Sequence, residues 1–375
     1  MAATIRDVAR RAGVSVATVS RVVNGSAHRV STATRLRVLD AVSELGYQAN
    51  VIAQGLKKRA TRTVALIVPD ISNPFFPAIA RGIEDTARQR GYAVLLCNTY
   101  EDLAAEHAHL QLLRKRWVDG LIFATVGSNT AHLRSLRDDG LPVVLVARDV
   151  EGMSIDAVLV DNFRGAYEGT AHLIRLGHRR IACITGPTGL RVAVERRRGY
   201  LQALADAGVV AQQDWFAEGD FTADGGRRAV EEFLEREVEF TALVAANDLM
   251  AIGAMEVLRA VGRRIPADVA VVGFDDITFA SLVSPALTTV AQPKYRMGQL
   301  AMERLFELMD DPRSASRQTV LTPQLVVRES CGAYLRKDDG RKSRVEGRSL
   351  SPRVGPESTF DVRPSTFGSS EEDHQ

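Results

Sequence analysis

The first 48 residues combine short helical repeats of apolar positions with turn residues. In the first repeat, Thr4 and Asp7 have the spacing of a capping box, apolar residues then recur every three or four positions, and Gly13 ends the pattern. A second helix is predicted to begin after Ser15 and to end at Asn24-Gly25, because hydroxyl side chains favour N-caps and glycine favours helix ends.

A third helix is predicted to start at Ser31 or Thr32 and to end at Gly46. Its larger apolar residues are expected to face a core: Leu36, Leu39, Val42 and Leu45. Three short helices of this kind predict one small all-α bundle at the start of the chain.

After Arg62 the pattern changes to short apolar runs that alternate with amphipathic helices. We expect strands at 64–68, 93–97, 120–124, 143–146, 157–160, 181–185, 242–245 and 269–274. Helices are expected at 75–90, 104–116, 164–176, 195–207, 225–235, 249–261 and 297–309. This alternation is typical of an α/β fold with doubly wound parallel sheets, and the number of units exceeds one core, so we predict two lobes with a cleft between them.

The last segment, residues 336–375, has a different composition. It is rich in Ser, Pro, Gly, Arg and Glu, with eight basic and eight acidic residues. Such a segment buries too little apolar surface to fold, so we predict a disordered tail.

Charge is distributed unevenly along the chain. The formal net charge of the 375 residues is only +2, but residues 1–60 hold ten Lys or Arg against three acidic residues. A basic segment of this kind favours a nucleic-acid partner, although a merely solvated face has the same composition.

Two further features limit the class of protein. No stretch of about 18 apolar residues and no apolar leader occurs in the sequence, so we expect a cytoplasmic protein without a membrane partner. Cys97, Cys183 and Cys331 are widely separated, which predicts reduced, buried thiols and no metal.

The first two predicted helices have the spacing of a helix-turn-helix, with a small residue at Ala9, a turn glycine at Gly13 and an apolar anchor at Val19. An ordinary helical hairpin would show much the same spacing. The residues themselves go further, because Thr4-Ile5-Arg6-Asp7-Val8-Ala9 and Thr18-Val19-Ser20-Arg21-Val22-Val23-Asn24-Gly25 resemble the opening signature of the lactose/galactose repressor (LacI/GalR) family.

This resemblance implies a headpiece, residues 1–48, that binds double-stranded operator DNA. The residues that it assigns to DNA are Thr4, Ser15, Val16, Ala17, Thr18, Ser20, Arg21, Asn24, Leu56 and Lys57. Val16, Ala17 and Arg21 would face the bases, and an arginine can donate two parallel hydrogen bonds to guanine. Thr4, Ser15, Ser20 and Asn24 would donate to phosphates, although some of them could act simply as helix caps.

Residues 49–61 resemble the family's hinge helix and linker. There Leu56 would wedge into a minor-groove step, with Lys57 beside it on the phosphates. Gly55 should cost about 0.5–1 kcal/mol in a helix interior, so we expect a helix only when DNA and a partner subunit hold it. The alternative is a plain linker that contains a leucine.

Motifs over the following 270 residues resemble the family's periplasmic-binding-protein-like sensor. They include Asp70-Ile71-Ser72-Asn73-Pro74-Phe75-Phe76, Asn247-Asp248, Gly273-Phe274-Asp275-Asp276, and Pro285-Ala286-Leu287-Thr288-Thr289-Val290 followed by Gln292. The resemblance implies an effector-binding and dimerisation domain at 62–335, with lobe one at about 62–161 and 292–321 and lobe two at about 162–291 and 322–335.

Open α/β sheets bind ligands at the carboxyl ends of their strands, and the sensor motifs lie at those ends. The residues expected to contact a small effector are Asn73, Phe75, Phe76, Arg148, Arg196, Phe221, Asn247 and Asp275. For single members the alternatives are a helix N-cap at Asp275, a surface pair of Arg196 with Glu195, and a core position for Phe76.

The polar members of this set suit a ligand rich in hydroxyl, carboxylate or amide groups, most simply a sugar, a sugar acid or a related metabolite. Two departures from the family pattern refine this expectation. Ala147 stands where relatives often have an aspartate, and Arg148 beside it favours an anionic ligand such as a sugar acid or phosphate ester. Leu190 stands where purine-sensing relatives have an arginine, which disfavours a purine.

The sequence therefore predicts a transcriptional repressor and not an enzyme. It has no Gly-x-Gly-x-x-Gly turn after the first strand, no phosphate-binding loop with Lys, and no nucleophile elbow. We expect a homodimer on a pseudo-palindromic operator, with a tetramer left open, a non-covalent effector and no cofactor. The alternative is a cytoplasmic small-molecule-binding protein or an α/β enzyme of similar fold without operator specificity.

Overall fold

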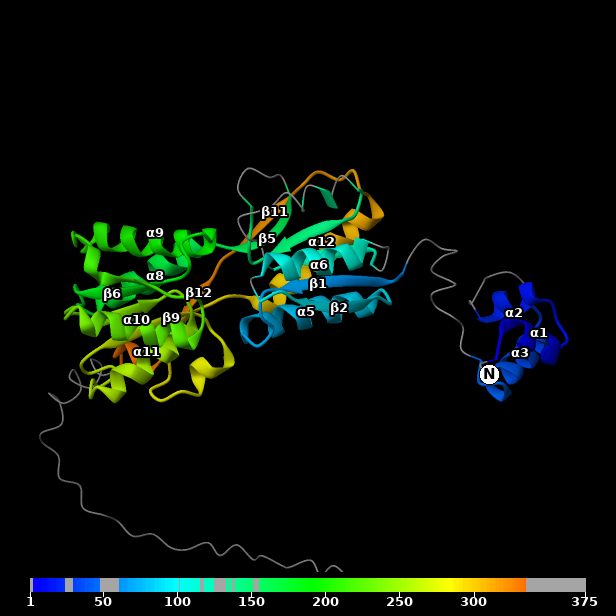
Figure 1. Cartoon of the computed structure of the whole chain (residues 1–375), viewed down its shortest axis with the longest axis horizontal. Helices are drawn as coiled ribbons and strands as arrows, with labels where there is room; N and C mark the ends of the chain where they lie inside the picture. Colours follow the sequence, from blue (N-terminus) through cyan, green and yellow to red (C-terminus); the bar gives the residue numbers. More distant parts are fainter. Residues whose placement is uncertain are drawn as a thin grey trace, which may run out of the picture. The chain divides into compact units, whose positions relative to one another are not determined.

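A computed structural model describes residues 3–23, 30–47, 61–100, 102–114, 118–124, 133, 135–136, 139–150 and 155–334. The headpiece contains three helices, α1 (Ile5–Ala12), α2 (Val16–Val23) and α3 (Thr32–Glu44) (Figure 1). The capping box predicted for α1 is present, and Gly13 ends the helix in the left-handed conformation with φ 63°. The predicted starts of α2 and α3 are also confirmed, with Ser31 as the N-cap of α3.

The small core of the headpiece is made of Val8, Val19, Val38 and several alanines. The prediction that Leu36 and Leu39 face this core was wrong, because both side chains are about half exposed. Val38 and Ala41 are buried on α3 instead, with Val42 and Leu45 packed partly against the same core, so the helix turns a different face to α1 and α2 than expected.

Lobe one is built on a six-stranded sheet in the order β11-β5-β4-β3-β1-β2, in which all strand pairs are parallel. Its strands are β1 (Thr63–Val68), β2 (Ala93–Asn98), β3 (Gly120–Phe123), β4 (Val143–Val146), β5 (Asp156–Val160) and β11 (Gln318–Leu321). Helices α5 (Phe75–Gln89) and α12 (Lys294–Asp310) pack on one face, and α6 (Leu103–Arg114) packs on the other.

Lobe two repeats this plan with a six-stranded sheet in the order β12-β10-β9-β8-β6-β7. Its strands are β6 (Ile181–Thr185), β7 (Phe216–Glu218), β8 (Ala242–Ala245), β9 (Ala270–Asp275), β10 (Thr288–Ala291) and the antiparallel edge strand β12 (Gln324–Val326). Helices α8 (Asn162–Arg175) and α9 (Arg191–Asp206) cover one face, and α10 (Ala223–Glu235) and α11 (Asp248–Ala260) cover the other (Figure 1). Three 3₁₀ turns complete the described elements: η1 (Gln213–Trp215), η2 (Thr278–Ser281) and η3 (Glu329–Cys331).

These two sheets confirm the predicted fold class, and the differences concern short elements. Strands β7, β10, β11 and β12 were not predicted, because each has only three or four residues and mixes polar with apolar side chains, so it forms no continuous apolar run. Helix α9 begins at Arg191 rather than at residue 195, so the helix starts four residues earlier than expected. The chain passes between the lobes three times, after β5, β10 and β11.

Glycines allow three pairs of helices to approach very closely. In the α5–α12 pair, a Cβ on Gly298 would overlap the carbonyl group of Ile79, and one on Gly82 would overlap that of Tyr295. Equivalent contacts join α8 to α9 and α10 to α11. Each pair is therefore held by backbone packing that a larger residue would disrupt.

None of the helices in the described ranges is long and apolar enough to cross a membrane. All three cysteines are buried, as expected.

Candidate functional site

The outer face of α2 carries the residues expected to read DNA bases. Val16 is 42% exposed and Ala17 and Arg21 are also exposed, whereas Val19 and Val22 on the opposite face are buried in the headpiece core. The helix thus presents one arginine and two apolar side chains to solvent, while the buried Val19 and Val22 hold it to α1 and α3. This surface has the form that major-groove reading requires.

The residues expected to contact phosphates have a second role as helix caps. The hydroxyl oxygen of Thr4 accepts a hydrogen bond from the N–H of Asp7 at 3.4 Å, and that of Ser15 accepts from the N–H of Thr18 at 3.2 Å. Thr18 and Ser20 are half-buried. Asn24, Leu56 and Lys57 lie outside the described residues.

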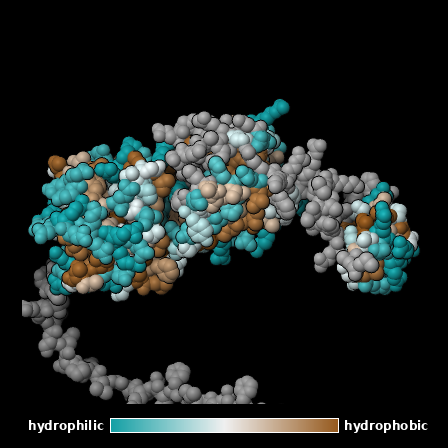
Figure 2. Space-filling view, in the orientation of Figure 1, coloured by the Kyte–Doolittle hydropathy of each residue, from teal (hydrophilic) through white to brown (hydrophobic). Residues whose placement is uncertain are grey.

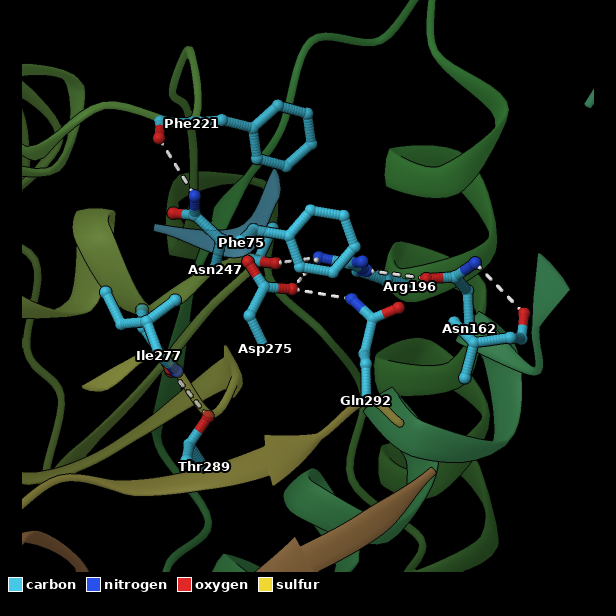
Figure 3. Close-up of polar contacts among 12 residues, drawn as sticks. Phe75, Asn162, Arg196, Phe221, Asn247, Asp275, Ile277, Thr289 and Gln292 are labelled. Carbon is cyan, nitrogen blue, oxygen red and sulfur yellow. Dashed lines mark hydrogen bonds and ion pairs between the residues drawn. The ribbon is translucent and has the colours of Figure 1, made fainter. Parts of the chain in front are cut away.

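The centre of the candidate effector site is an ion pair between Arg196 of α9 and Asp275 at the end of β9. The guanidinium Nη1 lies 3.6 Å from the carboxylate Oδ1, and both side chains are at least 90% buried. Figure 3 shows the carboxylate of Asp275 between Arg196 and Gln292. Arg196 is therefore not the surface residue of the alternative interpretation.

Neighbouring groups hold each member of the pair in place. Arg196 donates to Oδ1 of Asn162 at 2.8 Å and to the carbonyl of Ala246, and its guanidinium lies 3.7 Å from the ring centroid of Phe274. Gln292 donates to Oδ1 of Asp275 at 2.6 Å.

Burial disfavours the charged forms of both Arg196 and Asp275. Burial lowers the pKa of Arg196, although Asp275 acts against this shift, and burial raises the pKa of Asp275, although Arg196 acts against it. Both shifts favour the neutral forms, so the cost of removing the charges from water exceeds their mutual attraction. Such a pair adds little to stability, and strongly perturbed groups of this kind concentrate at functional sites.

Asn247 and Phe221 form the adjoining part of the site. Asn247 is the N-cap of α11, where its Oδ1 accepts from the N–H of Met250 and its Nδ2 donates to the carbonyl of Phe221 at 2.8 Å. Phe221 has a left-handed backbone with φ 65°, and its ring lies where a Cβ on Gly186 would be. The amide of Asn247 thus holds the loop that carries the Phe221 ring.

Lobe one contributes Asn73, Phe75, Phe76 and Arg148. The side chain of Asn73 accepts from the N–H of Phe75 at 3.0 Å, and the two phenylalanine rings pack edge to face with centroids 5.1 Å apart. Both rings are buried. Phe76 is accordingly a core residue as well as a member of the predicted set.

Arg148 is 8% exposed and lies close enough to Arg196 to lower the pKa of that residue further. Next to it, Asp149 of lobe one forms an ion pair with Arg191 of lobe two at 2.8 Å. Three arginines and two aspartates thus lie near the end of β4 and the start of α9.

Four further residues belong to this site and were not predicted as members of it: Asn162, Gln292, Asp248 and Lys294. Asn162 and Gln292 lie just after the carboxyl ends of β5 and β10, so the rule that selected Asp275 could have found them. Asp248, next to Asn247 after the carboxyl end of β8, was within reach of the same rule. Lys294 was not predictable in this way, because its contacts depend on the turn that follows β9.

Two family models match the chain over these two regions. The model for bacterial regulatory proteins of the lacI family matches residues 4–50, and the model for periplasmic binding proteins and the sugar binding domain of the LacI family matches residues 61–329. The chain belongs to the LacI family.

Transcriptional regulators from several bacteria are similar to this chain over nearly their whole length. The repressor PurR of Aliivibrio salmonicida is 36% identical over 329 residues, which cover 88% of this chain and 98% of the relative. The regulator DegA of Bacillus subtilis is 36% identical over 333 residues, with the same coverage. Catabolite control protein A of Priestia megaterium is 37% identical over 331 residues, covering 88% and 99%.

Solved structures of transcriptional regulators have the same fold as this chain. The lac repressor dimer bound to operator and the anti-inducer ONPF has a TM-score of 0.80 at 30% identity, and the complex of the regulator CelR with cellobiose has a TM-score of 0.69 at 37% identity. Both comparisons cover 88% of this chain and 99% of the other. The protein is thus a DNA-binding transcriptional regulator with a sugar-binding type of sensor domain, and its relatives are regulators rather than enzymes.

Proposed function

We propose that this LacI-family protein is a cytoplasmic repressor that binds a pseudo-palindromic operator as a homodimer, and that a sugar acid or sugar phosphate in the cleft between its lobes sets its operator affinity. The effector binds without covalent attachment, and no cofactor takes part. The observation that carries the proposal is the buried pair of Arg196 and Asp275, with Arg148 close to it.

A ligand of this class has the groups that these side chains need. Its hydroxyls can donate to Asp275 and accept from Arg196, and a carboxylate or phosphate can accept from Arg148. Phe75 and Phe221 offer apolar ring surfaces to the face of a sugar. Binding would supply polar partners for groups whose charged forms burial now disfavours.

Exposed apolar side chains support the homodimer. Leu95 and Leu96 are 44% and 42% exposed on β2, the edge strand of the lobe-one sheet, and Phe279 and Leu282 are exposed at η2 of lobe two. Figure 2 shows a surface that is mostly hydrophilic with separate hydrophobic patches. An apolar edge strand invites pairing, so a second copy of the chain is the natural partner for it.

A thermal-shift screen of the full-length protein tests the effector class. The probes are D-gluconate, D-glucose 6-phosphate, D-glucose and hypoxanthine at equal concentration. We expect an anionic sugar to raise the melting temperature, because a ligand that binds only the folded state stabilises it. The shift should vanish in Asp275→Ala and remain in the exposed-site control Arg198→Met. A shift with hypoxanthine alone would overturn the proposed class.

Operator binding is tested with DNA selected from a random library by the full-length protein. We expect the selected sequences to contain two related half-sites in inverted orientation, because one headpiece reads too few base pairs for useful specificity. Sedimentation should give a dimer in the presence of that DNA. A monomer on DNA would exclude the proposed assembly.

A further inference from the structure

The turn after β9 has an unusual backbone. Asp275 and Asp276 have φ angles of 112° and 55°, so two consecutive residues other than glycine lie at positive φ. Such conformations are unfavourable and persist only where surrounding groups hold them. The direction of the Asp275 carboxylate depends on this turn, because the turn sets the orientation of its Cα–Cβ bond.

Contacts from lobe two hold one side of the turn. The carboxylate of Asp248, the first residue of α11, accepts from the N–H of Ile277 at 2.8 Å. Arg328 donates to the carboxylate of Asp276 at 2.6 Å. These groups fix the turn within its own lobe.

Lys294 holds the turn from the other lobe. Its half-buried Nζ donates to the backbone carbonyls of Asp275 and of Asp276, the latter at 2.8 Å. Burial lowers the pKa of Lys294, while Asp275, Asp276 and Asp248 act to raise it, so the ammonium is placed among three carboxylates. The contact satisfies two carbonyls with one cation.

Lys294 is also the first residue of α12, a helix of lobe one. Helix α12 is packed against α5 through Gly298 and Gly82, with no room for a Cβ at either position. Helix α5 begins at Phe75, one of the lobe-one residues expected to contact the effector. A short path of direct contacts therefore runs from the turn through Lys294 and α12 to α5.

We propose that Lys294 is a positioning residue that couples the direction of the Asp275 carboxylate to the α12–α5 helix pair of lobe one. A ligand that reorients Asp275 moves the two carbonyls, and Lys294 passes that movement to the start of α12. Only the role of Asp275 as an effector-binding residue rests on the proposed function. The coupling itself is a property of the ligand-free protein.

Amide hydrogen exchange of the full-length protein without ligand tests this coupling. In Lys294→Met, which keeps the length of the side chain but cannot donate, we expect exchange at Asp276 and Ile277 to rise about tenfold or more, because each lost hydrogen bond to a charged donor favours local opening. Exchange at Phe75 and Phe76 should rise with it. Lys294→Arg, which can donate to both carbonyls, should restore the wild-type rates.

Arg296→Met is the matched control, because Arg296 lies on the same helix, is half exposed and pairs with Glu303. It should leave all four amides unchanged. Unchanged exchange in Lys294→Met overturns the proposal. A rise confined to the turn, or one spread evenly over the effector-binding domain (residues 62–335), overturns it as well. Because no ligand is used, a negative result here is separate from a failure to find a sugar effector.

Discussion

Replacing Arg196 by Met tests the account of the buried pair most directly. The substitution leaves Asp275 almost fully buried without its arginine partner, with Gln292 still donating to its carboxylate and the Lys294 ammonium nearby. It also removes the donors to Asn162 and to the carbonyl of Ala246. Breaking one partner of a buried pair costs about 3–5 kcal/mol, so the melting temperature of a domain of this size should fall by roughly 6–20 °C.

The same change has a predictable pH dependence. Arg196 is the strongest of the groups that lower the pKa of Asp275, so its loss raises further a pKa that burial already raises. A carboxyl whose pKa is higher in the folded state adds stability below its unfolded pKa, and that stability is lost as the pH rises through the folded value. The destabilisation should therefore grow as the pH rises above about 4, the pKa of an aspartate in the unfolded chain.

Urea unfolding followed by tryptophan fluorescence measures both effects, since Trp215 is buried in lobe two. A second substitution, Asp275→Asn, should recover most of the lost stability, because it removes the unpaired charge and keeps an acceptor for Gln292. Arg198→Met on the exposed side of the same helix is the control. A loss below about 1 kcal/mol that does not change with pH would show that Arg196 does not compensate the buried charge of Asp275.

Single substitutions at three other positions should each have a measurable effect. Burial raises the pKa of Asp248 well above its usual value, so the unfolding free energy of the wild type should fall by up to about 1.4 kcal/mol per pH unit above about pH 4. Urea unfolding of Asp248→Asn should show a weaker pH dependence, because this variant lacks the contribution of Asp248. Arg21→Ala should weaken operator binding about tenfold or more and flatten the preference at one base pair, measured by fluorescence anisotropy; equal preference in both proteins would contradict a base contact. Gly298→Ala should destabilise the core domain by about 1–3 kcal/mol despite the better helix propensity of Ala, because the methyl group meets the Ile79 carbonyl, while Gly189→Ala, in open space, should change the melting temperature little.

The sequence predicted the fold well because its main elements have clear periods. The buried runs at β4, β6 and β8 were predicted with their true bounds, and the capping box at Thr4 marked the start of α1 correctly. The edge strands β7, β11 and β12 were missed, because these short segments contain polar residues and lack the continuous apolar run that marks the equally short strands β4 and β8. The face of α3 was assigned wrongly, since apolar character alone does not reveal that Val38 and not Leu36 meets the other helices.

The candidate site was predictable only in part, for a similar reason. Residues at strand ends, such as Asn73, Asn247 and Asp275, could be found because sheet topology brings those ends together. Their individual roles could not be found, since whether Asn247 caps a helix or faces a ligand depends on hydrogen-bond geometry. Lys294 was out of reach of any local pattern, because its partners are 18 and 19 residues away and in the other lobe.

The three passages of the backbone between the lobes restrict how the sensor can move. A single connecting strand would permit twisting in any direction, whereas three separate connections allow bending and resist torsion. The lobes therefore have few mechanical degrees of freedom, so even a small ligand can select one arrangement over another. Cutting one connection by a site-specific protease should relax this constraint without separating the lobes.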